Sequence, residues 1–239
     1  MSGRGITERV LSGCWSAEAQ RIAALDLVPY TSWYAEGHPH AEDHPHWRKQ
    51  HPARTWEYAQ VLRVMIDLPA RQRLMLDVGG AGSPLPWIVA SRRGQPVQII
   101  DPEFNGLTVG SEDPDHNPGM NGLRGRADFI SCISVIEHVE GEEAFLRDLV
   151  ELLAPGGVLL LTTDYVEDAP DGDVFQFHWM RKRIYTRASW FGSIANKHSV
   201  YGRLVDLGCS TFGACDSTYH GPIPDLGYSF ASLCVRKDG

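Results

Sequence analysis

Residues 74–82 read Leu-Met-Leu-Asp-Val-Gly-Gly-Ala-Gly, and they are the most informative part of the chain. Its apolar residues lead into Asp77, which predicts a buried strand that ends beside an acid. Gly79, Gly80 and Gly82 follow, where a Cβ would block both a positive-φ turn and the close approach of a ligand to the main chain. The serine and proline that come next suit the start of a helix. The stretch indicates a nucleotide-type cofactor loop at the first strand-to-helix crossover of an α/β sheet.

The composition is that of a soluble globular protein. The chain has 239 residues, of which 43% are hydrophobic and 22% charged, enough for one domain with a modest extension. No apolar run approaches the roughly 20 residues of a membrane-spanning helix, and the N-terminus lacks the apolar core of a signal peptide. The net charge of -8 argues against a nucleic-acid surface. Five scattered cysteines without a CxxC pair suggest reduced thiols, so we expect a cytoplasmic protein with no membrane segment.

The chain changes character at about residue 70. Residues 33–56 are rich in Trp, His and Pro, and apolar residues then recur at helical spacing from Trp56 until Pro69. We therefore predict an N-terminal helical and aromatic cap over residues 1–70. Residues 71–239 alternate short apolar runs with helical segments, as parallel α/β sheets do, and form the second predicted unit.

The same pattern predicts the individual elements. Near-continuous apolar runs indicate strands that are covered on both faces, and helical spacing indicates the connecting helices. The expected strands lie at 73–78, 96–101, 127–133 and 157–163, the helices near 84–93, 141–153 and 186–197, and two further strands within 205–219 and 226–237.

A second acid stands at the end of the second predicted strand. Asp101 follows Asp77 at close to the spacing of about 20 residues at which a carboxylate meets a ribose. Its two oxygens can accept hydrogen bonds from both ribose hydroxyls. On these features alone, a nicotinamide dehydrogenase remains open.

Two later segments narrow the choice. Residues 127–139 form an apolar run that opens into Glu137 and His138, and residues 152–161 carry a Leu-x-Pro-Gly-Gly turn before another apolar run. Together with the glycine loop and the acid after the second strand, this order resembles the class I S-adenosylmethionine-dependent methyltransferases. The resemblance covers about residues 72–165. It implies a three-layer, Rossmann-like α/β fold with a seven-stranded sheet whose last strand is antiparallel, and S-adenosylmethionine as the cofactor.

The resemblance also implies a cofactor site. The glycine loop and its acid would line the methionine moiety and the ribose, the second acid would hold the ribose hydroxyls with a proline beside the adenine, and the backbone of the fourth strand would lie under the cofactor. The residues concerned are Asp77, Gly79, Gly80, Gly82, Asp101, Pro102 and Cys132.

One departure concerns the adenine. The segment between Asp101 and Asp128 is short for a full helix, a third strand and an adenine-binding acid, so we expect that element to be abbreviated or remodelled. Glu112, Asp113 and Asp115 all remain candidates for the adenine contact.

Two histidines are candidates for the catalytic base. An unperturbed histidine, with a pKa near 6.5, can take a proton from a substrate hydroxyl at neutral pH. His138 lies beyond the fourth strand, where it can face the acceptor or simply pack. His178 lies in an aromatic segment after the fifth strand that suits a small, partly apolar acceptor.

We predict no metal site. Some members of the family bind a divalent ion through Glu-x-x-Glu-His, but Ser134 stands where the first glutamate should be. The five histidines between His38 and His51 match no tetrahedral pattern and suit a polar lid.

The expected activity is methyl transfer to an oxygen or nitrogen atom of a small molecule of the sugar or secondary-metabolite class. Two alternatives stay open. A continuous basic surface that includes residues 181–183 and Arg187 would favour an RNA or protein methyltransferase, whereas a blocked acceptor cleft would favour a non-catalytic cofactor-binding subunit. The sequence does not predict the oligomeric state.

Overall fold

The structure is a computed structural model, and its description is confined to part of the chain. The described residues are 9–11, 57–58, 60–62, 64–65, 68, 74–80, 83, 85–101, 108–109, 122–166, 174–177, 180–194, 203–204, 210–212, 219–220 and 227–239.

Four parallel strands form the centre of the sheet. β2 pairs with β3 on one side and with β5 on the other, and β5 pairs with β6. Helix α3 leads from β2 to β3, and helix α5 leads from β5 to β6, which is the alternation expected of a Rossmann-like α/β fold. The bounds are β2 Met75–Val78, α3 Leu85–Arg93, β3 Val97–Ile100, β5 Ala127–Ile133, α5 Glu142–Leu152 and β6 Leu153–Val166.

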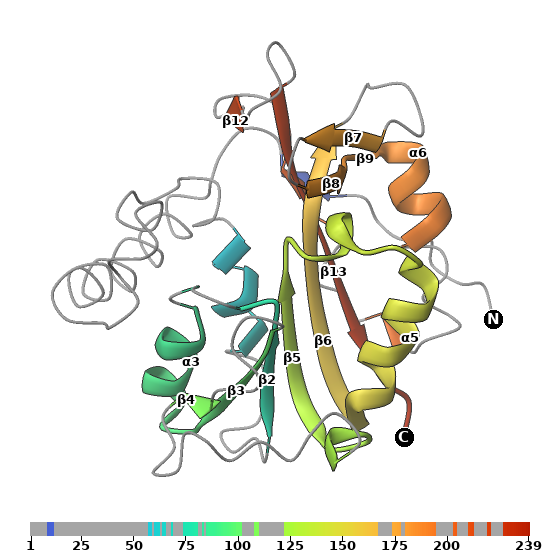
Figure 1. The fold of residues 1–239 in the computed structure, drawn as a ribbon. Helices are drawn as coiled ribbons and strands as arrows, with labels where there is room; N and C mark the ends of the chain where they lie inside the picture. The colour runs from blue at the N-terminus through green and yellow to red at the C-terminus, as the bar shows by residue number, and fades with distance from the viewer. Residues whose placement is uncertain are drawn as a thin grey trace, which may run out of the picture.

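The sheet is covered on both faces, which gives three layers (Figure 1). Met75, Phe129 and Val158 stand opposite one another in register and pack with α3, whereas the residue after each of them packs with α5. Successive side chains of a strand point to opposite faces, so each strand contributes to both cores. The continuous apolar runs of the sequence follow from this arrangement.

A long antiparallel strand completes the sheet beside β6. β13 (Gly227–Arg236) pairs with β6 from Ser229 opposite Tyr165 to Arg236 opposite Val158. The order along the sheet is β1-β11-β13-β6-β5-β2-β3-β4, and β9, β10 and β12 join off this path. The expected count of seven strands is not confirmed, because the described part of the chain places eleven strands in this sheet and several short ones extend its edges.

The remaining strands are short and extend the main sheet or form a separate hairpin. β7 and β8 form a separate antiparallel hairpin. The bounds are β1 Arg9–Leu11, β4 Thr108–Val109, β7 Val174–Phe177, β8 Met180–Arg183, β9 Tyr185–Thr186, β10 Arg203–Leu204, β11 Ser210–Phe212 and β12 Tyr219–His220.

Three expected elements differ from those observed. The Pro-Gly-Gly turn lies inside β6, which begins at Leu153, because the pairing of β5 and β6 absorbs it in a register shift between Ala127 and Phe129. The helix expected at 186–197 is one α-helical turn, α6 (Arg187–Ser189), followed by a π-helix, Trp190–Ile194. Within the stretch 205–219, which was expected to form one strand, the described residues belong to two strands, the short β11 and the start of β12.

The segment between Asp101 and Asp128, expected to be abbreviated or remodelled, is described only in part, and that expectation stays a prediction. β4 has two residues and runs antiparallel to β3. Glu112, Asp113 and Asp115 lie outside the described residues.

The predicted N-terminal cap falls mostly outside the described residues and stays a prediction. Within 57–65, the described residues are helical. Tyr58, Val61 and Leu62 pack in the same core as α3, together with Val64 and Met65. Among the described residues, no helix has the length and apolar character needed to cross a bilayer.

Two cysteines lie in the sheet as buried free thiols. Cys132 belongs to β5 and Cys234 to β13. Burial raises the pKa of the Cys132 thiol well above its ordinary value and that of Cys234 to about 12. Both thiols therefore stay protonated and act in packing.

Candidate active site

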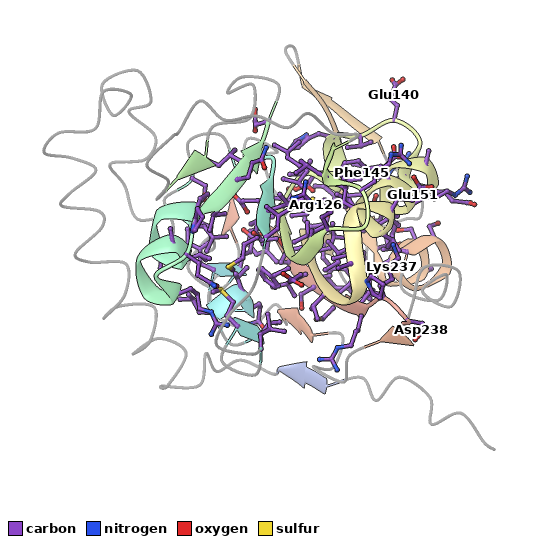
Figure 2. The ribbon with its side chains drawn as sticks, turned by 90° about the horizontal axis from the view of Figure 1, so that it is seen from below. Arg126, Glu140, Phe145, Glu151, Lys237 and Asp238 are labelled. Carbon is purple, nitrogen blue, oxygen red and sulfur yellow. The ribbon has the colours of Figure 1, made fainter. Side chains whose placement is uncertain are left out.

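The carboxyl ends of the parallel strands meet at one edge of the sheet, where ligands bind in folds of this kind (Figure 1). The Gly79 N–H donates to the Ile100 carbonyl at 2.8 Å, which holds the loop after β2 against the end of β3 and beside Asp101. Val78 pairs with Cys132 on the other side. The structure thus brings together the start of the glycine loop, Asp101 and the end of β5. Charged residues such as Arg126 and Lys237 lie at the opposite edge (Figure 2).

Asp77 is a buried acid beneath this edge. Its Oδ1 accepts a hydrogen bond from Ser131 Oγ at 2.5 Å, and Ser131 stands opposite it in the register of β2 and β5. Burial above all, together with the charge of Asp101, raises the pKa of Asp77 to about 7, although the Ser131 hydrogen bond lowers it. A positive ligand nearby would favour the ionised form of this carboxyl group.

The glycine loop passes too close to its surroundings to carry side chains. A Cβ on Gly79, whose φ is +74°, would lie 2.2 Å from Val135 Cγ2. A Cβ on Gly80 would lie 1.8 Å from Asp77 Oδ2. Bare backbone therefore lies directly over one carboxylate and next to a second, Asp101. This combination fits a ligand that brings hydroxyl donors and positive charge, as S-adenosylmethionine does.

A buried polar cluster that sequence reasoning missed supports the end of β5. Glu57 Oε1 accepts hydrogen bonds from Ser134 Oγ at 2.6 Å and from Thr162 Oγ1 at 2.5 Å. All three side chains are buried. From the sequence, Ser134 was interpreted only as the residue that replaces a metal ligand. The segment 54–58, which contains Glu57, could close over the cofactor or simply pack, but no contact of Glu57 with the sheet was predicted. The polar serine that interrupts an apolar run was the only available signal.

The Glu137–His138 pair is divided between the interior and the surface. Both residues lie on a 3₁₀ helix, η2 (Ile136–His138). It follows the turn formed by Ser134 and Val135 at the end of β5, called the β5 turn below. Glu137 is buried, and its Oε2 accepts a hydrogen bond from Thr163 Oγ1 at 3.1 Å. His138 is exposed. The glutamate is thus tied to the sheet, while the histidine can meet a substrate.

The basic segment 181–183 is partly neutralised. Arg183 forms an ion pair with Glu142 and lies over the Tyr185 ring, 5.9 Å from its centroid. The Tyr185 hydroxyl donates to the same Glu142 at 2.8 Å, and its ring meets Trp190 edge-on. Burial raises the pKa of Tyr185 above its ordinary value. The charge of Arg183 is therefore paired with a carboxylate of the protein itself.

Comparison with known proteins decides the family. A family model described as a methyltransferase domain matches residues 3–210. The chain belongs to this methyltransferase family. The enzyme class predicted from the sequence, the superfamily and S-adenosylmethionine as its cofactor are thereby confirmed.

Individual relatives of this methyltransferase are distant. Over 102 residues it is 30% identical to the mitochondrial ubiquinone biosynthesis O-methyltransferase of Schizosaccharomyces pombe, and the match spans 37% of this chain and 37% of that protein. Among solved structures it is similar to the 1,6-didemethyltoxoflavin-N1-methyltransferase of Burkholderia thailandensis, with 16% identity, a TM-score of 0.49, and coverage of 96% of this chain and 94% of that one.

Three predicted site residues of the methyltransferase are not placed. Gly82, Pro102 and His178 lie outside the described residues, as do the histidines between His38 and His51. Among the residues that are described, no group of three His, Cys, Asp or Glu side chains is arranged to hold a metal ion.

Proposed function

We propose that this methyltransferase transfers the methyl group of S-adenosylmethionine to an oxygen or nitrogen atom of a small-molecule acceptor. The engagement of Arg183 by Glu142 carries this choice, because it takes one cation out of the basic segment that a nucleic-acid substrate would need. The net charge of -8 and the partial similarity to an O-methyltransferase of ubiquinone biosynthesis add support.

The proposed cofactor site consists of the residues at the carboxyl edge. Asp101 binds the ribose hydroxyls with its two oxygens, with Pro102 beside the adenine. The backbone of Gly79, Gly80 and Gly82 lets the methionine moiety approach, over the buried carboxyl group of Asp77. Cys132 contributes backbone beneath the cofactor.

The proposed chemistry asks little of the protein beyond positioning and proton removal. S-adenosylmethionine, when bound, supplies a methyl group that its sulfonium charge already activates. The chain holds the acceptor in line, excludes water and accepts a proton. His138 is the proposed base, since it is exposed directly beside the β5 turn; His178 is the second candidate.

The proposed organisation keeps the N-terminal cap of residues 1–70 beside a methyltransferase domain of residues 71–239. The packing of Tyr58 and Val61 with α3 supports a close association of the two parts.

Calorimetry tests the cofactor site. We expect the protein to bind S-adenosylmethionine and S-adenosylhomocysteine but not NAD, and Asp101→Ala to weaken both by roughly tenfold or more, because the ribose loses a charged acceptor. Asp148→Ala, at an exposed position of α5, is the matched control and should bind as the wild type does. Unchanged binding by Asp101→Ala would remove Asp101 from the site.

Product analysis by mass tests the acceptor class. We expect one added methyl group on members of a panel of hydroxyl and amine small molecules, and none on RNA or protein. His138→Ala should lower kcat by about 10²-fold or more with little change in cofactor affinity. Methylated RNA or protein would favour the macromolecular alternative, and cofactor binding without any product would favour a non-catalytic subunit.

A further inference from the structure

Two consecutive residues of the N-terminal helical segment contact different loops of the carboxyl edge. Glu57 accepts hydrogen bonds from Ser134, just beyond β5, and from Thr162 of β6. The hydroxyl of Tyr58 accepts one from Ser83 Oγ at 3.0 Å. Ser83 in turn donates its N–H to the Gly80 carbonyl at 2.9 Å, which closes the glycine loop. One short segment therefore joins both loops that flank the proposed cofactor site.

The turn that Glu57 supports is conformationally costly. Ser134 has a φ of 52°, and it is the only residue other than glycine with a positive φ among those described. L side chains rarely adopt this region without help from their surroundings. The Ser134 N–H donates to both the carbonyl and the hydroxyl of Thr162, each at 3.2 Å. Because Glu57 accepts from both side chains, it closes a buried ring of hydrogen bonds around the turn, and a carboxylate acceptor makes these bonds strong.

The position of this turn sets the geometry of the site. The next residue, Val135, occupies the space where Gly79 would carry a side chain, so the turn determines how closely the glycine loop approaches β5. η2 then begins at Ile136 and carries His138. A shift of Ser134 would move both the floor of the proposed cofactor site and the proposed base.

We propose that Glu57 is a positioning residue for methyl transfer: it fixes the β5 turn through Ser134 and Thr162 and, with Tyr58, sets the spacing of the two loops between which the cofactor binds. Glu57 is fully buried, so it acts through these partners and touches no ligand. The inference rests on the cofactor site proposed above. Under this proposal, the helical segment that contains Glu57 and Tyr58 supports the cofactor site directly.

Calorimetry with S-adenosylhomocysteine, well below the unfolding temperature, tests the inference without a known acceptor. We expect Glu57→Ala to weaken binding by roughly tenfold or more, because the loops lose their common support. Val235→Ala is the matched control: Val235 is buried in β13 opposite Leu159, away from the carboxyl edge, so its loss lowers Tm but leaves affinity unchanged. Glu57→Gln keeps an acceptor oxygen and should restore most of the affinity.

A double-mutant cycle identifies the route of the effect. Ser134→Ala removes one hydroxyl donor to Glu57 and keeps the Ser134 N–H in place. Combined with Glu57→Ala, it should cost no more affinity than Glu57→Ala alone, since the contact is already lost. If the two losses multiply, or if Glu57→Ala binds within about twofold of the wild type, the proposal is overturned. Should Glu57→Ala fail to fold, Ser134→Ala decides: it should weaken binding, and an affinity within about twofold of the wild type overturns the proposal.

The two proposals fail in distinguishable ways. Normal binding by the wild type, loss in Asp101→Ala and unaltered binding in the Glu57 variants would overturn the role of Glu57 alone. Absence of binding by the wild type would overturn both.

Discussion

Asp77 stands out among single residues because its surroundings oppose its charge. The carboxyl group is 2% exposed, it receives one hydrogen bond from Ser131, and Asp101 adds a like charge nearby. Burial above all, and the charge of Asp101, raise the pKa of this carboxyl group to about 7, although the Ser131 hydrogen bond lowers it. A cationic cofactor would favour the ionised form, so in the proposed cofactor site this acid would select for positive charge.

This pKa predicts how stability depends on pH. The unfolded side chain has a pKa of 3.8 and the folded one a pKa of about 7, so between these values the folded state binds more protons. The free energy of unfolding therefore falls as the pH rises through this interval. The stabilisation that comes from the protonated Asp77 is fully lost above about pH 7. Asp77→Asn keeps an acceptor for Ser131 but cannot ionise. Relative to the wild type, it should gain up to about 4 kcal/mol between pH 4 and pH 8.

Urea denaturation of both proteins at about pH 4 and about pH 8, at constant ionic strength, measures this gain. An equal difference in unfolding free energy at the two pH values would show that Asp77 does not titrate in this range.

Among the elements, α5 shows how a helix start can hold a neighbouring segment. Leu146, Leu149 and Val150 face the core, whereas Glu142 in the first turn reaches across to Tyr185 and Arg183. The N-cap residue, Gly141, contributes no side-chain hydrogen bond. Glu142 therefore serves both the positive end of the helix and the segment that carries β8 and β9.

Substitution of Glu142 should destabilise the protein more than substitution of Tyr185, its hydrogen-bond partner. Tyr185→Phe loses one hydrogen bond, which costs about 1 kcal/mol. Glu142→Ala costs more, about 2–3 kcal/mol, because it leaves the buried Tyr185 hydroxyl and Arg183 without their shared acceptor. Urea denaturation measures both values, and Glu143→Ala, on the exposed side of the same turn, is the control. Equal losses in all three variants would contradict a specific role of Glu142.

The central elements were predictable because each follows from local pattern. The glycine loop, the apolar strands and the helices α3 and α5 lie where the sequence puts them, to within a few residues. The hydrogen bond between Asp77 and Ser131 was not predictable, because it depends on the register of β2 against β5. Glu57 was missed for a similar reason, since it meets Ser134 only through tertiary packing. The short edge strands form through long-range pairing that leaves little periodic signal.

At the scale of the whole molecule, two cores share one sheet, and β13 serves both. Leu233 and Val235 pack with α5, whereas Cys234 packs with α3. Lys237 continues the pairing beyond β13, because its N–H donates to the Gly157 carbonyl at 2.9 Å and its carbonyl accepts from the Gly156 N–H at 3.0 Å. The order of the sheet places β13 inside it, between β11 and β6.

Shortening the chain should therefore have a sharp threshold. A protein that ends at residue 226 lacks β13, so β6 loses its pairing partner on one side and both cores lose buried side chains. It should show no cooperative unfolding by circular dichroism. A protein that ends after Lys237 loses two exposed residues and should unfold as the wild type does. Cooperative unfolding of the shorter protein would show that β13 is dispensable.

The place of β13 also bears on how the protein is made. A ribosome that has finished β6 holds a nascent chain in which one edge of that strand has no neighbour, since residues 227–236 are still to be translated. Unpaired strand edges readily pair with other chains. Any pause in translation between β6 and β13 therefore lengthens the time during which the newborn protein depends on chaperones to avoid aggregation.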